Sequence, residues 1–153
     1  MSRQRVVVTG MGAVTPVGVG IKQSFNNILQ GKTGMRFLDP AKMAFKFKCL
    51  VGATLPDEVL TDEFHEEHKI RMDDKFYSVS NYIMKEAMEM SGLDMRNDKL
   101  PYDRERIGLI VANLGEPLQN MLRLEKLRGG RLMTVTNFGI TGALALEYNF
   151  GGY

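Results

Sequence analysis

Short apolar runs alternate with amphipathic stretches along the first third of the chain. The β-branched run Arg5–Thr9 is followed at once by glycine and predicts a buried strand. A glycine-rich turn over residues 10–20 leads into Ile21–Gln30, whose apolar positions recur at helical spacing and predict a helix. Residues Thr33–Pro40 predict a loop, and the loose alternation over Phe45–Leu55 predicts a second strand. The apolar face of the predicted helix consists of Ile21, Phe25, Ile28 and Leu29.

A longer amphipathic stretch and a continuous apolar run dominate the rest of the chain. The acidic segment Asp57–Lys69 predicts an irregular region or a short helix. A helix capped by Asp73 or Asp74 is expected to run to Ser91, with a buried apolar stripe. The near-continuous apolar run Arg106–Ala112 predicts a strand covered on both faces. Two more helices are expected over Leu118–Leu127 and Phe138–Phe150. The apolar stripe of the helix that ends at Ser91 consists of Phe76, Val79, Ile83, Ala87 and Met90.

The order of these elements predicts an α/β fold. Strands that alternate with helices are typical of a mainly parallel or mixed sheet with helices on both faces. The last predicted helix, Phe138–Phe150, is apolar almost all round and therefore belongs in a well-covered core. Because the chain ends at Tyr153, immediately after the two glycines that follow this helix, we expect residues 1–153 to be a domain that is incomplete at its C-terminal end.

Composition narrows the functional classes. The chain has 153 residues, 44% of them hydrophobic and 25% charged, which is typical of a folded globular protein. Its net charge of +2 with mixed signs gives no reason to expect a nucleic-acid partner. No apolar run approaches the roughly 20 residues that span a bilayer, and no signal peptide is visible. The single cysteine excludes an internal disulfide and favours a cytoplasmic location.

Three motifs invite a chemical interpretation, and for each a structural interpretation is favoured. Val8–Gly12 contains Gly-x-Gly after a predicted strand, but the third glycine and the helix of a dinucleotide-binding turn are missing. His65 and His68 could share a helix face, but a zinc site needs further ligands and the chain has no other histidine. Cys49 falls inside a predicted strand, where burial is favoured over nucleophilic catalysis. We therefore predict no metal site and no bound cofactor.

The motifs taken together resemble the elongating type of β-ketoacyl-acyl-carrier-protein synthases, in the thiolase-like superfamily. The opening run Arg5–Gly18 resembles the strand and turn R-V-V-[VI]-T-G-x-G-x-[VL]-[ST]-P-x-G with which that family begins. The resemblance continues to the end of the chain and implies a thiolase-like α/β fold. The further segments that carry it are Leu29–Gly34, Arg71–Asp73, Arg104–Val111 and Gly142–Gly152.

The resemblance implies a chemistry whose main groups lie outside this chain. The family performs a decarboxylative Claisen condensation of an acyl thioester with malonyl carried on acyl carrier protein, in fatty-acid or polyketide-like lipid biosynthesis. Its nucleophilic cysteine would fall about eight residues beyond Tyr153, and its two histidines lie further along. No residue of this chain therefore inherits a catalytic role, and the chain alone is expected to be inactive. The alternatives are a non-catalytic partner like a chain-length factor, or a truncated synthase-like protein.

The resemblance also implies substrates, partners and a pocket. Substrates would be phosphopantetheine thioesters on acyl carrier protein, and the full-length protein would be a homodimer or a synthase-like heterodimer. The family's glycine-rich turn after Ile107–Ala112 is replaced by Asn113–Pro117, which favours a specialised pathway. Pocket walls or subunit contacts are expected at Leu114, Phe138 and Ile140. A basic cluster could contact the carrier protein or form a solvated helix face, and it consists of Arg123, Lys126, Arg128 and Arg131.

Overall fold

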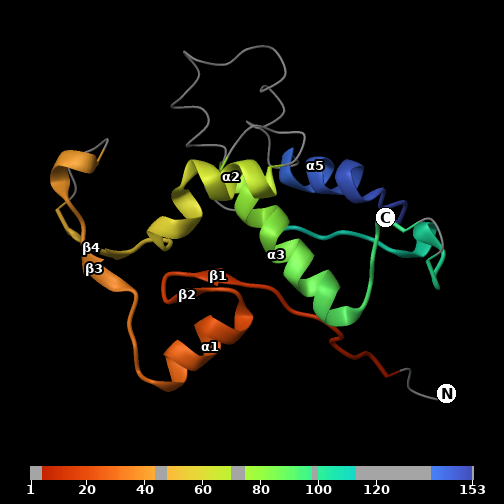
Figure 1. Cartoon of the computed structure of the whole chain (residues 1–153), viewed down its shortest axis with the longest axis horizontal. Coiled ribbons are helices and arrows are strands. Elements are labelled where there is room, and N and C mark those ends of the chain that lie inside the picture. The colour runs from red at the N-terminus through yellow and green to blue at the C-terminus, as the bar shows by residue number, and fades with distance from the viewer. Residues whose placement is uncertain (1–4, 44–47, 70–74, 98–99, 113–138, 153) are drawn as a thin grey trace, which may run out of the picture.

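The computed structural model describes residues 5–43, 48–69, 75–97, 100–112 and 139–152, and these form helices joined by short strands and turns (Figure 1). Single turns of 3-10 helix cover Pro40–Lys42, Asp57–Leu60 and Arg104–Arg106. The strands and α-helices are β1 Val14–Thr15, β2 Gly18–Val19, α1 Ile21–Leu29, β3 Met35–Phe37, β4 Val51–Ala53, α2 Asp62–His68, α3 Lys75–Ser91 and α5 Gly139–Tyr148.

The strands form two separate antiparallel pairs. β1 and β2 make a tight hairpin in which Val14 lies opposite Val19, and β3 pairs with β4 so that Phe37 lies opposite Val51. β4 confirms part of the strand predicted over Phe45–Leu55, whereas β3 forms where a loop was predicted. A mainly parallel or mixed sheet is therefore not present among the described residues.

Two predicted strands are wrong in this structure. Residues Arg5–Thr9 and 107–112 run as irregular backbone, and Arg104–Arg106 is a 3-10 turn. Val6 is 95% exposed and Ile110 is 96% exposed, so neither run is covered on both faces. Ile107, Leu109 and Val111 are only partly buried against the core. A strand needs a neighbouring strand to satisfy its backbone groups, and none of the described strands lies beside either run.

The predicted helices are confirmed wherever the structure describes them. α1 matches Ile21–Gln30, α3 begins just after Asp73 and Asp74 and ends at Ser91, and α5 matches Phe138–Phe150 to within two residues. Thr61 caps the short helix α2, because its hydroxyl accepts a hydrogen bond from the Phe64 amide at 3.1 Å. The helix predicted over Leu118–Leu127 lies outside the described residues.

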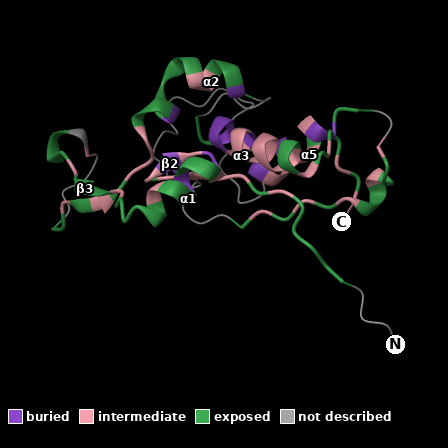
Figure 2. Cartoon of the chain, turned by 60° about the horizontal axis from the view of Figure 1, so that its bottom comes forward, coloured by how far each residue is buried: buried purple, intermediate pink, exposed green. Residues whose placement is uncertain are grey.

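The core lies between α3 and α5 (Figure 2), where apolar faces of the two helices meet. Ile140 and Leu144 of α5 pack against Tyr77 of α3, and all three are 3% exposed or less. The buried apolar residues of this cluster are Tyr77, Met95, Ile140, Ala143, Leu144 and Tyr148. None of the described helices is long and apolar enough to cross a membrane.

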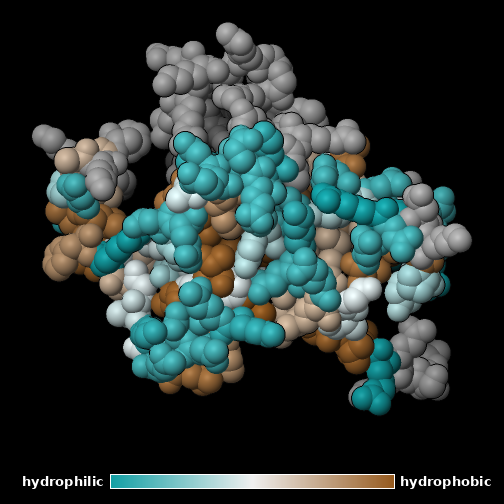
Figure 3. All heavy atoms as spheres, viewed as in Figure 1, coloured by the Kyte–Doolittle hydropathy of each residue, from teal (hydrophilic) through white to brown (hydrophobic). Residues whose placement is uncertain are grey.

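The apolar face predicted for α1 is exposed in this structure. Phe25, Ile28 and Leu29 are 58%, 57% and 70% exposed. Hydrophobic surface is visible along the edge formed by α1 and near β3 and β4 (Figure 3). The predicted stripe on α3 is buried at Val79, but Phe76 and Met90 are 40% and 47% exposed.

Candidate functional site

The glycine-rich turn packs directly on α3. A Cβ atom at Gly10 would lie 2.0 Å from the carbonyl oxygen of Ala87, and one at Gly12 would lie 2.1 Å from that of Ile83. The two glycines therefore let the turn approach the helix backbone, a use of Gly-x-Gly that involves no nucleotide.

Glu86 fixes the turn to the start of α1. The amide of Ala13 donates to one carboxylate oxygen of Glu86 at 2.9 Å, and the amide of Ile21 donates to the other at 2.7 Å. Ile21 is the first residue of α1, where backbone amides have no partner within the helix. Gly20 precedes α1 with no side-chain cap, so a carboxylate from α3 takes the place of a local cap.

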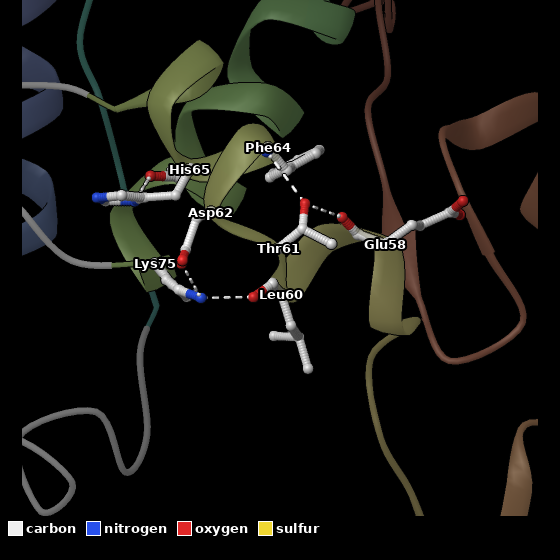
Figure 4. Close-up of polar contacts among 8 residues, drawn as sticks. Glu58, Leu60, Thr61, Asp62, Phe64, His65 and Lys75 are labelled. Carbon is white, nitrogen blue, oxygen red and sulfur yellow. Dashed lines mark hydrogen bonds and ion pairs between the residues drawn. The ribbon is translucent and has the colours of Figure 1, made fainter.

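A cluster of polar side chains joins α2 to the start of α3 (Figure 4). Lys75 donates to a carboxylate oxygen of Asp62 at 2.8 Å and to the carbonyl oxygen of Leu60 at 2.5 Å. The hydrogen bond from Lys75 and its charge lower the pKa of Asp62 below its usual value of 3.8. His65 Nδ1 lies 2.7 Å from the hydroxyl of Ser78.

This cluster contains a serine and a histidine, the residue types of a nucleophile and its base, but its geometry fits a role in packing α2 against α3. Ser78 is 0% exposed, so its hydroxyl is closed to a substrate. Asp62 forms an ion pair with Lys75 at 2.8 Å. We infer that Ser78 and His65 hold α2 against α3 and do not act in acyl transfer.

His68 has a different environment from His65. Its ring stacks on Phe64 at a centroid distance of 4.3 Å, and its Nδ1 lies 3.0 Å from the Phe64 carbonyl oxygen. Among the described residues, no group of three or more His, Cys, Asp or Glu side chains could hold a metal ion. The two histidines thus serve two separate packing contacts.

Cys49 is exposed, which corrects the prediction of burial inside a strand. It precedes β4 by two residues, and its sulfur lies 3.7 Å from the carbonyl oxygen of Val51. No base or helix N-terminus is found beside it among the described contacts. The described surroundings of Cys49 thus include none of the groups that activate a thiol as a nucleophile.

An open cavity of about 460 Å³ lies where the end of α3 meets α5. Its lining includes apolar side chains and Tyr148. It also includes two basic and two acidic side chains, whose charges cancel. These charges give no electrostatic selection for an anionic or a cationic ligand. The residues that line the cavity are Lys85, Met88, Glu89, Gly92, Leu93, Asp94, Arg96 and Tyr148.

Tyr148 links this cavity to the core. Its hydroxyl donates a hydrogen bond to the Asn81 side chain, whose amide donates to the His68 carbonyl oxygen at 2.8 Å. The Arg96 guanidinium lies 5.3 Å from the Tyr148 ring centroid and pairs with Glu147 at 2.8 Å. Burial raises the pKa of Tyr148 above 10.0, and Arg96 opposes that shift.

The structure places one of the predicted pocket residues. Ile140 is 3% exposed and belongs to the core cluster, and its role as a pocket wall stays a prediction. Leu114 and Phe138 lie outside the described residues, as does the basic cluster of Arg123, Lys126, Arg128 and Arg131. Glu86 and Asn81 were not predicted from the sequence, because a polar residue within an amphipathic helix gives no sign of a distant partner.

A comparison of the chain with models of protein families shows the family to which it belongs. The family described as β-ketoacyl synthase, N-terminal domain, matches residues 3–153. The chain belongs to the β-ketoacyl synthase family. Membership implies the thiolase-like α/β fold, of which the described helices and small antiparallel sheets are parts. A mainly parallel or mixed sheet stays a prediction.

Curated relatives carry names from the same family. The chain is 28% identical over 116 residues to 3-oxoacyl-[acyl-carrier-protein] synthase 2 of Vibrio cholerae, which covers 74% of the chain and 26% of that protein. It is 34% identical over 77 residues to the mitochondrial 3-oxoacyl-[acyl-carrier-protein] synthase of Arabidopsis thaliana, which covers 50% of the chain and 13% of that protein. The aligned part of this β-ketoacyl synthase chain thus spans about a quarter or less of these relatives.

Proposed function

We propose that this chain is the N-terminal part of an elongating β-ketoacyl-acyl-carrier-protein synthase. Such an enzyme condenses an acyl thioester with malonyl on acyl carrier protein and releases carbon dioxide, in fatty-acid or polyketide-like lipid biosynthesis. The family match over residues 3–153 carries the proposal, and the names of the relatives support it.

The chain would supply scaffold to this reaction and no catalytic group. The family's nucleophilic cysteine corresponds to a position about eight residues beyond Tyr153. Within the chain, Cys49 is exposed without an activating group among its described contacts, and Ser78 is fully buried. We therefore propose that the 153 residues alone catalyse no condensation.

The proposed partners follow from the same assignment. Substrates would arrive as phosphopantetheine thioesters on acyl carrier protein, and the full-length protein would be a homodimer or a synthase-like heterodimer. The chain itself would bind no cofactor. A cytoplasmic location stays a prediction, and the word mitochondrial in a relative's name makes an organelle the alternative.

Charge reversal tests the contact with the carrier protein. We expect Arg123→Glu with Lys126→Glu to weaken the binding of acyl carrier protein at least about tenfold, because clustered positive charge attracts an acidic partner. Lys22→Glu with Lys48→Glu changes the net charge equally at exposed positions and is the control. Calorimetric titration at two salt concentrations measures both variants, and equal weakening by the two would contradict a contact at the cluster.

The coding sequence beyond Tyr153 separates the proposed enzyme from its alternatives. The enzyme requires a cysteine about eight codons further on. The protein encoded by the full gene must then form 3-oxoacyl carrier protein, which mass spectrometry detects. Replacement of that cysteine by serine should abolish product formation. Another residue there favours a partner like a chain-length factor, and an early stop codon favours a truncated synthase-like protein.

A further inference from the structure

Arg104 donates hydrogen bonds to backbone carbonyl oxygens in two distant parts of the chain. One guanidinium nitrogen donates to the carbonyl oxygens of Met95 at 3.0 Å and of Tyr148 and Asn149 at 3.3 Å each. The other donates to the carbonyl oxygen of Asn97 at 2.8 Å. These contacts tie the loop after α3 to the end of α5.

The end of α5 needs such a partner. The last carbonyl groups of a helix have no partner within it and carry partial negative charge, and the last turn of α5 contains no basic residue of its own. Asn149 then leaves the helix with φ +53°, in the left-handed region that is common after a helix end. Arg104 thus provides from elsewhere the cation and the donors that α5 lacks.

The backbone of the same region holds the residues that follow. The amide of Gly151 donates to the carbonyl oxygen of Arg104 at 3.3 Å, and the amide of Gly152 donates to that of Ile107 at 3.1 Å. A Cβ atom at Gly152 would lie 2.7 Å from the Ile107 carbonyl, so only glycine fits this approach. Gly151 and Gly152 therefore lie directly against residues 104–107.

We propose that Arg104 is a positioning residue that caps the C-terminal end of α5 and fixes the path of Gly151 and Gly152. Its catalytic consequence rests on the function proposed above, in which the segment after this glycine leads to the nucleophile. In that enzyme Arg104 sets where the nucleophile-bearing segment enters the fold, while making no contact with substrate itself.

Amide hydrogen exchange in the 153-residue chain tests this role without reference to activity. We expect Arg104→Gln to lower the protection of the Gly151 and Gly152 amides about tenfold or more, the effect of losing at least one charged hydrogen bond. The α3 amides of Val79 and Ile83 should change less than about twofold, since the loss is local. Arg106→Gln is the matched control, because that exposed side chain makes no described contact with α5.

The conservative variant completes the test. Arg104→Lys keeps the charge but has a single nitrogen, which cannot take the place of both guanidinium nitrogens on the α5 end and on Asn97, so it should lose protection at the two glycines as well. If Arg104→Gln unfolds the chain, Arg104→Lys gives the deciding measurement. Protection equal to that of Arg106→Gln would overturn the proposal, as would a loss spread equally over α3. An inactive full-length enzyme would contradict the proposed function and leave this result standing.

Discussion

Single polar side chains fasten the described elements to one another. Glu86 joins α3 to the glycine-rich turn and to the start of α1 through two backbone amides. Asn81, which is 1% exposed, joins the end of α2 to Tyr148 of α5. A half-buried donor or acceptor that loses its partner costs more than the bond itself contributes, so these residues should be sensitive to conservative change.

Glu86→Gln tests the fastening of the turn. The amide group of glutamine can accept only one of the two hydrogen bonds and turns a donor towards the other backbone amide. We expect the free energy of unfolding in urea to fall by about 1–3 kcal/mol. Glu89→Gln on the same helix, at an exposed position, should change it by less than about 0.5 kcal/mol. Equal effects at the two positions would mean that the bonds of Glu86 contribute nothing.

We expect the free energy of unfolding to depend on pH in the alkaline range because of Tyr148. Since its pKa is raised above 10.0 in the fold, the folded chain holds this proton more tightly than the unfolded chain. The resulting stability is fully present below pH 10.0 and is lost as the pH rises through the folded pKa. The free energy of unfolding measured between pH 9 and 11 should therefore fall less steeply in Tyr148→Phe. The same slope in both proteins would contradict the burial of this hydroxyl.

At the scale of elements, α1 and α5 use their apolar residues differently. α5 buries Ile140 and Leu144 against α3, whereas α1 leaves Ile28 and Leu29 more than half exposed. The stability of α1 comes instead from its N-terminus, where Ser24 also donates to the Gly18 carbonyl oxygen at 3.0 Å.

A matched pair of substitutions measures this difference. Ile140→Ala removes buried atoms from the core and should lower the free energy of unfolding by about 2–5 kcal/mol. Ile28→Ala, which changes the same side chain at an exposed site, should lower it by less than about 1 kcal/mol. Denaturation in urea gives both values. A cost for Ile28→Ala as large as that for Ile140→Ala would show that α1 is covered.

Helices were predictable from the sequence, whereas only part of one predicted strand, Phe45–Leu55, formed and the long-range contacts were not predictable. α1, α3 and α5 follow from periodicity and capping, which act within a few residues. The apolar runs Arg5–Thr9 and Arg106–Ala112 suggest strands, but a strand forms only where another strand lies beside it. The contacts of Glu86 with the glycine-rich turn and those of Arg104 with the end of α5 join residues more than 40 positions apart, and no local pattern in the sequence encodes them.

At the scale of the whole molecule, the chain combines a small core with much exposed apolar surface. Val6, Val7 and Val8 are 95%, 67% and 80% exposed, and the face of α1 is exposed as well. Large exposed apolar patches are typical of surfaces that another polypeptide covers. The synthase relatives are longer, since the aligned part of the chain covers 26% of the one from Vibrio cholerae.

We propose above all that these residues serve a condensing enzyme as scaffold and hold none of its catalytic groups. Intact-protein mass spectrometry of the 153-residue chain, incubated with acyl carrier protein that bears an acyl thioester, tests it most directly. We expect no increase in mass that corresponds to a transferred acyl group. An acyl adduct that is abolished by Cys49→Ser would contradict it, because the exposed thiol of Cys49 would then be the nucleophile.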